Sequence, residues 1–144
     1  MKTIAEKAAE LSGSFSNFED WLDKYNYIID IGKSLPALDE TKKNPSNLIS
    51  GCQSQVWITA SYKDGAVFFE GDSDALITKG IAAILISVLS NSTPDDIIKC
   101  DMHFIDEIGL REHLSPTRAN GLNGMIKQMK LYALAFKTKY EKQA

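Results

Sequence analysis

Apolar residues recur at helical spacing along the first quarter of the chain. Residues 3–11 predict a short helix, and a second helix should follow with Ser16 or Asn17 as its N-cap. The apolar stripe of this second helix consists of Phe18, Leu22, Tyr25 and Ile29. We expect it to end near Gly32-Lys33, because glycine favours the position just after a helix and Pro36 follows.

The pattern changes in the middle of the chain. Residues 35–51 are polar and follow neither the helical nor the strand period, which predicts a long ordered loop, and loops of this length are usually functional or disordered. Residues 55–62 alternate between apolar and polar side chains, as a half-buried strand does. Asp64-Gly65 is a strong hairpin signal, so residues 66–70 should form the returning strand.

The second half of the chain predicts three further helices and a short strand. Residues 71–73 should break the strand and cap a helix over about residues 74–90, which is apolar almost all round and should lie in the core. Another helix should start at Thr93-Pro94, a third strand should span about residues 99–103, and the last helix should start at Ser115-Pro116. Together these elements predict a single α+β domain over residues 1–144. Its small antiparallel sheet of about three strands should be covered by helices on one side.

Composition narrows the class of protein. A chain of 144 residues with 44% hydrophobic residues can bury the core of one domain, and its net charge of −3 argues against nucleic acid as the main partner. The longest apolar run, residues 81–89, is too short to span a membrane, and the N-terminus has no long apolar segment of the signal-peptide type. Two cysteines do not make a disulfide framework, so we expect free thiols in a reducing cytoplasm.

Cys52 is the first candidate for chemistry, since it ends the long loop just before the first strand. Gly51 permits a tight turn and close approach by another molecule. Gln53 and Ser54 are uncharged, so no neighbour in sequence lowers the pKa of the thiol. Base rates favour a small buried hydrophobe, whereas placement on a loop favours function, and position alone leaves both readings open.

A wider set of motifs resembles one family. The string Gly51-Cys52-Gln53-Ser54-Gln55-Val56-Trp57 is similar to the signature of the SufE family of sulfur-transfer proteins. The further segments in register are Tyr27-Ile28-Ile29, Gly32, Leu35-Pro36, Gly71-Asp72-Ser73-Asp74-Ala75, Lys79-Gly80, His113-Leu114-Ser115-Pro116-Thr117-Arg118 and Gly121-Leu122. Several motifs in order are more specific than one cysteine-containing heptapeptide, and they favour the functional reading of Cys52.

The resemblance implies a SufE/IscU-like fold and a sulfur relay in place of a stand-alone enzyme. Cys52 would accept the terminal sulfur from a persulfide on a SufS- or CsdA-type cysteine desulfurase, stimulate that enzyme, and pass the sulfur to a SufBCD-type iron–sulfur assembly scaffold. The resemblance also implies that Arg118, and with it Gly51 and Gln53, contacts the desulfurase, and that this chain needs no cofactor or metal ion. It fits both SufE and its relative CsdE.

The implied chemistry is a displacement at sulfur, analogous to thiol–disulfide exchange. A thiol of ordinary pKa is only a few per cent ionised at pH 7, so the encounter with the partner would have to activate Cys52. Arg118 could help to hold the complex or the developing charge. It could equally be a surface arginine near a helix N-terminus, where the dipole mildly disfavours it.

Three other features have simpler interpretations. Cys100 and His103 have a C-x-x-H spacing, but a metal site needs three or four ligands and a strand would point these two residues to opposite faces, so we expect a structural thiol. Asp72 and Asp74 are expected to cap the following helix. Trp21, Trp57, Phe68 and Phe69 are expected to be core or strand-pair residues. An IscU-like metal-binding scaffold and a non-catalytic interaction domain remain the alternative functions.

Overall fold

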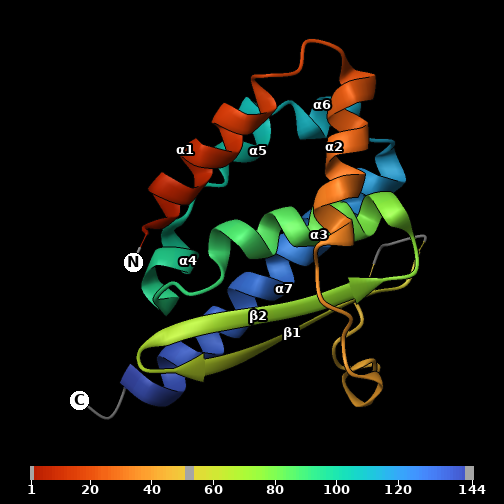
Figure 1. Cartoon of the computed structure of the whole chain (residues 1–144). Coiled ribbons are helices and arrows are strands. Elements are labelled where there is room, and N and C mark those ends of the chain that lie inside the picture. The colour runs from red at the N-terminus through yellow and green to blue at the C-terminus, as the bar shows by residue number, and fades with distance from the viewer. Residues whose placement is uncertain (1, 51–53, 142–144) are drawn as a thin grey trace.

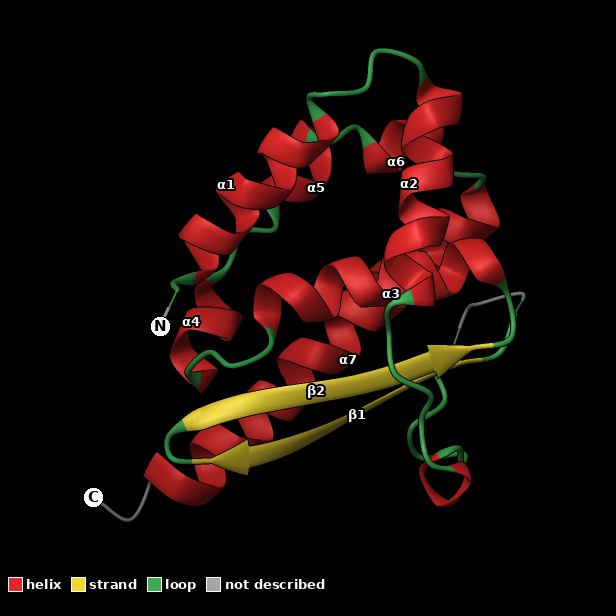
Figure 2. Ribbon diagram, in the orientation of Figure 1, coloured by secondary structure: helices red, strands yellow, loops and turns green. Residues whose placement is uncertain are grey.

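The computed structural model describes residues 2–50 and 54–141, in which helices pack against a long two-stranded hairpin (Figures 1 and 2). The elements are α1 (Ile4–Phe15), α2 (Trp21–Lys33), the short 3-10 helix η1 (Glu40–Lys42), β1 (Val56–Lys63), β2 (Ala66–Ser73), α3 (Leu76–Leu89), α4 (Pro94–Lys99), α5 (His103–Glu107), α6 (Leu110–His113) and α7 (Pro116–Glu141). None of the helices in these described ranges has the length and apolar content needed to cross a membrane.

The hairpin forms where the sequence predicts it. β1 and β2 pair antiparallel from Val56 opposite Ser73 to Lys63 opposite Ala66. Asp64 and Gly65 join the strands with φ angles of 52° and 82°, which are the two positive values that the tightest hairpin turns require. The returning strand is longer than predicted, because it continues through the polar residues up to Ser73.

One face of the hairpin is buried under helices. The inward side chains of the two strands include Val56, Ile58, Val67 and Phe69, all of them buried. Tyr62 lies on the same face and stacks on Phe136 of α7 with the ring centroids 5.5 Å apart. α3 packs against both β2 and α2, and its residues Ile81, Ile84, Leu85 and Leu89 are almost completely buried. The predicted central apolar helix is therefore confirmed.

Two glycines let α2 and α3 cross at very short range. A Cβ atom added to Gly80 would lie 2.2 Å from the carbonyl oxygen of Ile28, and one added to Gly32 would lie 2.7 Å from the backbone nitrogen of Gly80. Gly32 thus serves close packing. It does not end the helix in the left-handed conformation, since Ser34 is the C-cap and has right-handed helical angles.

The predicted start of the second helix is wrong. Ser16 is the C-cap of α1, and α2 is capped instead by Asp20, whose carboxylate accepts a hydrogen bond of 3.0 Å from the N–H of Leu22. Leu22, placed on the buried stripe by the sequence, is 63% exposed. Asp20 competes successfully for the cap because its carboxylate satisfies one of the free N–H groups at the helix start.

The third strand over residues 99–103 is also wrong. This segment contains the end of α4 and the start of α5, and Met102 between them has a φ of 61°. Asp101 accepts a hydrogen bond of 2.9 Å from the N–H of His103, which favours the helical start that follows. The described residues therefore hold a two-stranded sheet, and the α+β class is confirmed. The predicted start of the last helix at Ser115-Pro116 is confirmed as well.

Candidate functional site

Backbone hydrogen bonds fasten the two stretches of chain on either side of residues 51–53. The N–H of Ile49 donates to the carbonyl of Val56 at 2.8 Å, and the N–H of Ile58 donates to the carbonyl of Asn47 at 2.9 Å. Residues 47–49 therefore lie antiparallel to the start of β1, with Leu48 bridged to Trp57. Cys52, Gly51 and Gln53 themselves lie outside the described residues.

Helix α7 contacts both residues 47–50 and the start of β1. The hydroxyl oxygen of Tyr132 lies 2.7 Å from Oδ1 of Asn47 and 3.0 Å from the carbonyl oxygen of Ile58. Both atoms are within hydrogen-bond distance, so Tyr132 contacts the loop and β1 together. A Cβ atom on Gly124 would lie only 2.8 Å from the carbonyl oxygen of Ser50. The backbone of α7 thus touches the chain just before residue 51, and a glycine makes that approach possible.

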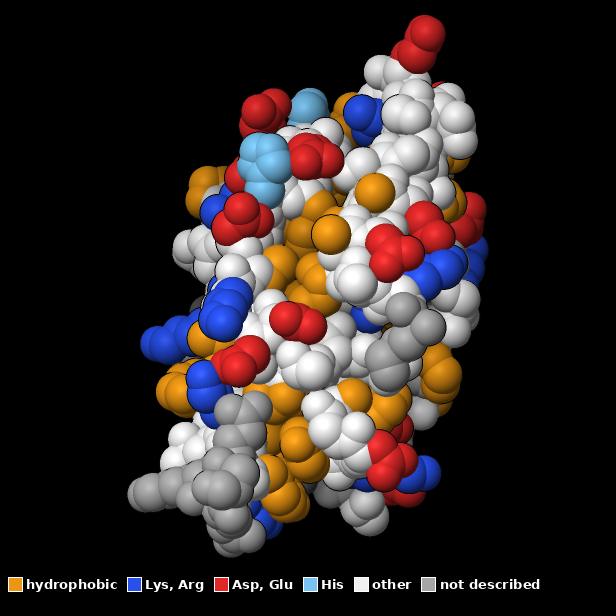
Figure 3. All heavy atoms as spheres, turned by 90° about the vertical axis from the view of Figure 1, so that its left-hand side faces the viewer, with side chains coloured by type: hydrophobic (Ala, Val, Ile, Leu, Met, Phe, Trp, Pro, Cys, Tyr) orange, Lys and Arg blue, Asp and Glu red, His pale blue; other side chains and the backbone are white. Residues whose placement is uncertain are grey.

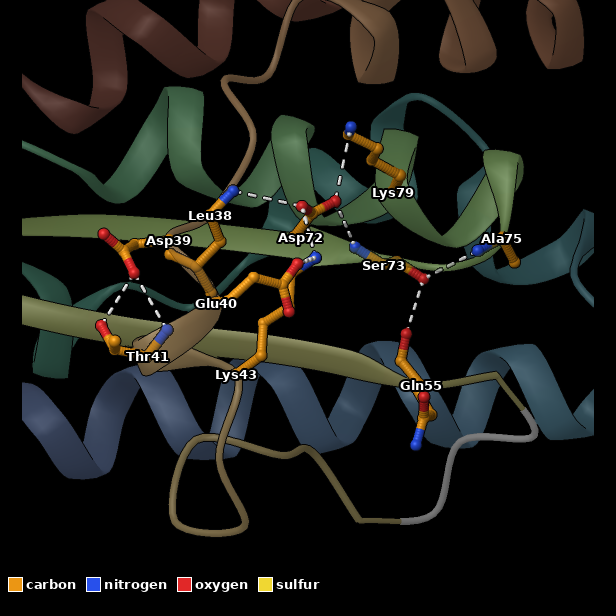
Figure 4. Close-up of polar contacts among 10 residues, drawn as sticks. All are labelled: Leu38, Asp39, Glu40, Thr41, Lys43, Gln55, Asp72, Ser73, Ala75 and Lys79. Atoms are coloured by element: carbon orange, nitrogen blue, oxygen red, sulfur yellow. Dashed lines mark hydrogen bonds and ion pairs between the residues drawn. The ribbon is translucent and has the colours of Figure 1, made fainter.

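Side chains from the end of β2 hold the other flank, at Gln55 (Figure 4). The N–H of Gln55 donates to Oδ1 of Asp74 at 3.0 Å, and the N–H of Asp74 donates back to the carbonyl of Gln55 at 3.2 Å. The hydroxyl of Ser73 donates to the same carbonyl at 2.9 Å. The predicted capping role is wrong for Asp72 and Asp74, because α3 begins at Leu76 with Ala75 as an N-cap that lacks a side-chain bond.

Asp72 is a buried anion, 6% exposed, that ties the long loop to the sheet (Figure 4). Its carboxylate accepts hydrogen bonds from the N–H of Leu38 at 3.1 Å and from that of Ser73 at 2.8 Å. The ammonium groups of Lys79 and Lys43 lie 3.4 Å and 3.5 Å away. Burial alone would raise the pKa of Asp72, but these N–H donors and Lys79 outweigh it and hold the pKa below its ordinary value.

The predicted ordered loop is therefore confirmed for residues 35–50. It is tied at Leu38 by Asp72 and at residues 47–49 by β1, with η1 in between. The sequence placed Asp72 within a family motif but did not show which residues it holds. Asp72 had the pattern of a helix cap and Tyr132 was not singled out, and only the fold brings both into contact with the loop over residues 35–50.

Arg118 lies exposed near the start of α7. Its Nη1 donates a hydrogen bond of 2.9 Å to the hydroxyl oxygen of Tyr25 on α2. Arg118 precedes Gly124 by six residues, which corresponds to about 9 Å along the helix axis. The same helix therefore presents Arg118 and supports the chain next to residue 51.

The second cysteine, Cys100, lies where α4 ends, next to α1. Cys100 is half-buried and lines a groove of about 620 Å³ between α1, α4 and α5, which His103 also lines. Figure 3 faces this side, where hydrophobic side chains form a band between charged ones. The argument that these two residues point to opposite faces of a strand is thus wrong. No three His, Cys, Asp or Glu side chains of residues 2–50 and 54–141 are grouped as a metal site would require.

Comparison with known proteins identifies the family and the fold. The model of the family described as SufE, an Fe–S metabolism associated domain, matches residues 9–133. The fold is similar to the solution structure of a hypothetical protein from Thermus thermophilus, with a TM-score of 0.76 and 18% sequence identity. The alignment covers 92% of this chain and 96% of that one.

Proposed function

The chain belongs to the SufE family of Fe–S metabolism proteins, and on this premise we propose that it accepts persulfide sulfur on Cys52 from a cysteine desulfurase. The proposed donor is of the SufS or CsdA type, and the proposed acceptor is a SufBCD-type iron–sulfur assembly scaffold. In this role the protein stimulates the desulfurase and carries one sulfur atom between two larger partners. Cys52 must be a free thiol for this purpose, so a reducing cytoplasmic setting is part of the proposal.

The observation that supports this proposal most is that the matched region, residues 9–133, includes Cys52 between two fastened flanks. Ile49 and Val56 are paired through the backbone, and Gln55 is held by Ser73 and Asp74. A reactive residue on a short connection with fixed ends can be offered to a partner without reordering the rest of the fold. Such a frame suits delivery of one atom between two proteins.

The transfer balances without an oxidant or a reductant. The Cys52 thiolate attacks the outer sulfur of the donor persulfide, a new S–S bond forms on Cys52, and the S–S bond of the donor breaks. The donor cysteine leaves as a thiolate, and the proton given up by Cys52 returns to that thiolate or to water. No cation next to Cys52 in sequence supplies activation, so the desulfurase itself is proposed to provide it, with contacts from Gly51, Gln53 and Arg118.

A cysteine-specific loading experiment tests the proposal. The protein is incubated with desulfurase, its pyridoxal phosphate and cysteine, and the intact mass is measured without reductant. The wild type and Cys100→Ser should gain one sulfur atom, whereas Cys52→Ser should gain none, because transfer requires the attacking thiolate. Sulfur uptake and desulfurase stimulation by Cys52→Ser would exclude the proposed relay. Bound iron with visible absorbance, in place of sulfur loading, would favour the alternative of a metal-binding scaffold.

A further inference from the structure

One face of α2 contacts the segment from His113 to Arg118 at two successive points. The ring of Trp21 stacks on that of His113, with the centroids 4.0 Å apart and the planes 17° from parallel. One turn further along α2, the hydroxyl oxygen of Tyr25 accepts the 2.9 Å hydrogen bond from Nη1 of Arg118. Residues four apart lie on the same helix face, so the two contacts lie side by side between α2 and residues 113–118.

The α2 side of this arrangement is rigid. Ile28, within one turn of Tyr25, is completely buried, and α2 crosses α3 at the close contact between Gly32 and Gly80. The ring of Tyr25 is itself half-buried and packs against the core. Its hydroxyl oxygen is therefore a fixed acceptor, held by a helix that has little room to shift.

The Arg118 side has the opposite character. Its side chain is exposed, and a free arginine loses considerable rotamer entropy when another molecule immobilises it. The hydrogen bond to Tyr25 uses one of the five N–H donors of the guanidinium group and leaves the others available to a carboxylate or a carbonyl of a partner. A guanidinium that is already oriented loses less entropy on binding than a free one.

We propose that Tyr25 is a positioning residue, which orients the Arg118 guanidinium for contact with an acceptor group on the desulfurase. This inference rests on the proposed function, since it assigns Tyr25 to the same encounter. The polar part of Tyr25, its hydroxyl oxygen, acts here, while its ring serves packing. Replacement by phenylalanine therefore separates the two roles.

A double-mutant cycle tests the inference. Tyr25→Phe, Arg118→Ala and the double variant are compared with the wild type for the affinity of the desulfurase complex and for kcat and KM of stimulated desulfurase activity. Tyr25→Phe should weaken the complex by about three- to tenfold and change KM more than kcat, the range expected when one flexible side chain must be immobilised on binding. The double variant should be no weaker than Arg118→Ala, because Tyr25 acts only through Arg118.

A matched control comes from the same helix. Tyr27→Phe makes the same chemical change, but the ring of Tyr27 packs on Phe15 and Phe18, away from Arg118. It should leave affinity and KM at their wild-type values. Both phenylalanine variants should unfold at the same temperature as the wild type. The inference would be overturned if Tyr25→Phe bound the desulfurase with wild-type affinity, or if the double variant lost affinity by the product of the two single losses. Neither result would affect the proposed sulfur loading of Cys52. A wild type that takes up no sulfur would overturn both.

Discussion

The chain next to Cys52 and the chain around Cys100 are held in different ways. The flanks of Cys52 are joined to the sheet by backbone pairing and to its end by Ser73 and Asp74. Cys100 is the C-cap of α4, and its carbonyl accepts a hydrogen bond from the ammonium group of Lys130, which also bonds the carbonyl of Ile98. The contrast teaches that the chain on both sides of one cysteine is held by several distant parts of the fold, whereas the other cysteine ends a short helix that one lysine of α7 holds.

The largest difference in stability is expected between a variant without Asp72, which holds the loop before Cys52, and one without Lys130, which holds the chain at Cys100. Asp72→Ala removes the acceptor of the buried N–H of Leu38 and of the half-buried N–H of Ser73, and should lower the free energy of unfolding by about 2–4 kcal/mol at pH 7. Lys130→Met should cost about 1 kcal/mol by the loss of its carbonyl contacts. Sulfur loading should slow for Asp72→Ala and stay unchanged for Lys130→Met. Urea unfolding and timed intact-mass measurements check both statements, and equal loading rates in the two variants would contradict the comparison.

The effect of Asp72 should depend on pH in a defined direction. Its pKa in the folded protein is lowered, so its ionised form contributes stability that is present above the ordinary carboxyl pKa and is lost as pH falls through the folded value. The stability gap between wild type and Asp72→Asn should therefore be widest near neutral pH and narrow under acid conditions. Urea unfolding of the two proteins at several pH values measures it, and a gap that grows toward acid pH would refute this role.

A smaller effect is expected where α7 touches the chain before residue 51. Gly124→Ala would place a Cβ atom 2.8 Å from the carbonyl oxygen of Ser50, whereas a Cβ atom on Gly13 of α1 would meet nothing within 4 Å. Both changes favour the helix by up to about 1 kcal/mol. The Gly124 variant should nevertheless be less stable than the Gly13 variant by about 1–3 kcal/mol, the usual cost of overpacking. Thermal unfolding compares the pair, and equal stability would mean that Ser50 moves aside freely.

The smallest effect on stability, and the most local one, is expected at Gln55. Asp74→Ala removes the acceptor of the Gln55 N–H at an exposed position, so the free energy of unfolding should change by less than about 1 kcal/mol. The flank at Gln55 should detach from Asp74 more often, and iodoacetamide should then modify Cys52 about two- to fivefold faster. Cys100 is an internal reference within each molecule. Acceleration at both thiols would indicate general loosening of the fold and not release of one flank.

The sequence predicted more of the fold than of the site. The hairpin turn at Asp64 and Gly65, the apolar helix α3 and the start of α7 follow from local turn chemistry and periodicity, and all three are confirmed. The start of α2 and the strand over residues 99–103 were wrong. Asp20, and not Ser16 or Asn17, caps α2, and the carboxylate of Asp101 accepts a hydrogen bond from the N–H of His103 where α5 begins. The motif around Cys52 indicated the family, and the match over residues 9–133 confirms it.

Local sequence therefore determined which residues turn, cap and form helices, together with the family and the candidate cysteine. Only the tertiary structure decided what holds the chain on either side of residues 51–53. Asp72 and Asp74 had the pattern of a helix cap, and instead they hold Leu38 and Gln55. Likewise, Tyr25 meets Arg118 across 93 positions of sequence. Such contacts depend on how α2, α7 and the hairpin pack together, and a periodic pattern reports which face of a helix is buried but not which polar group it meets.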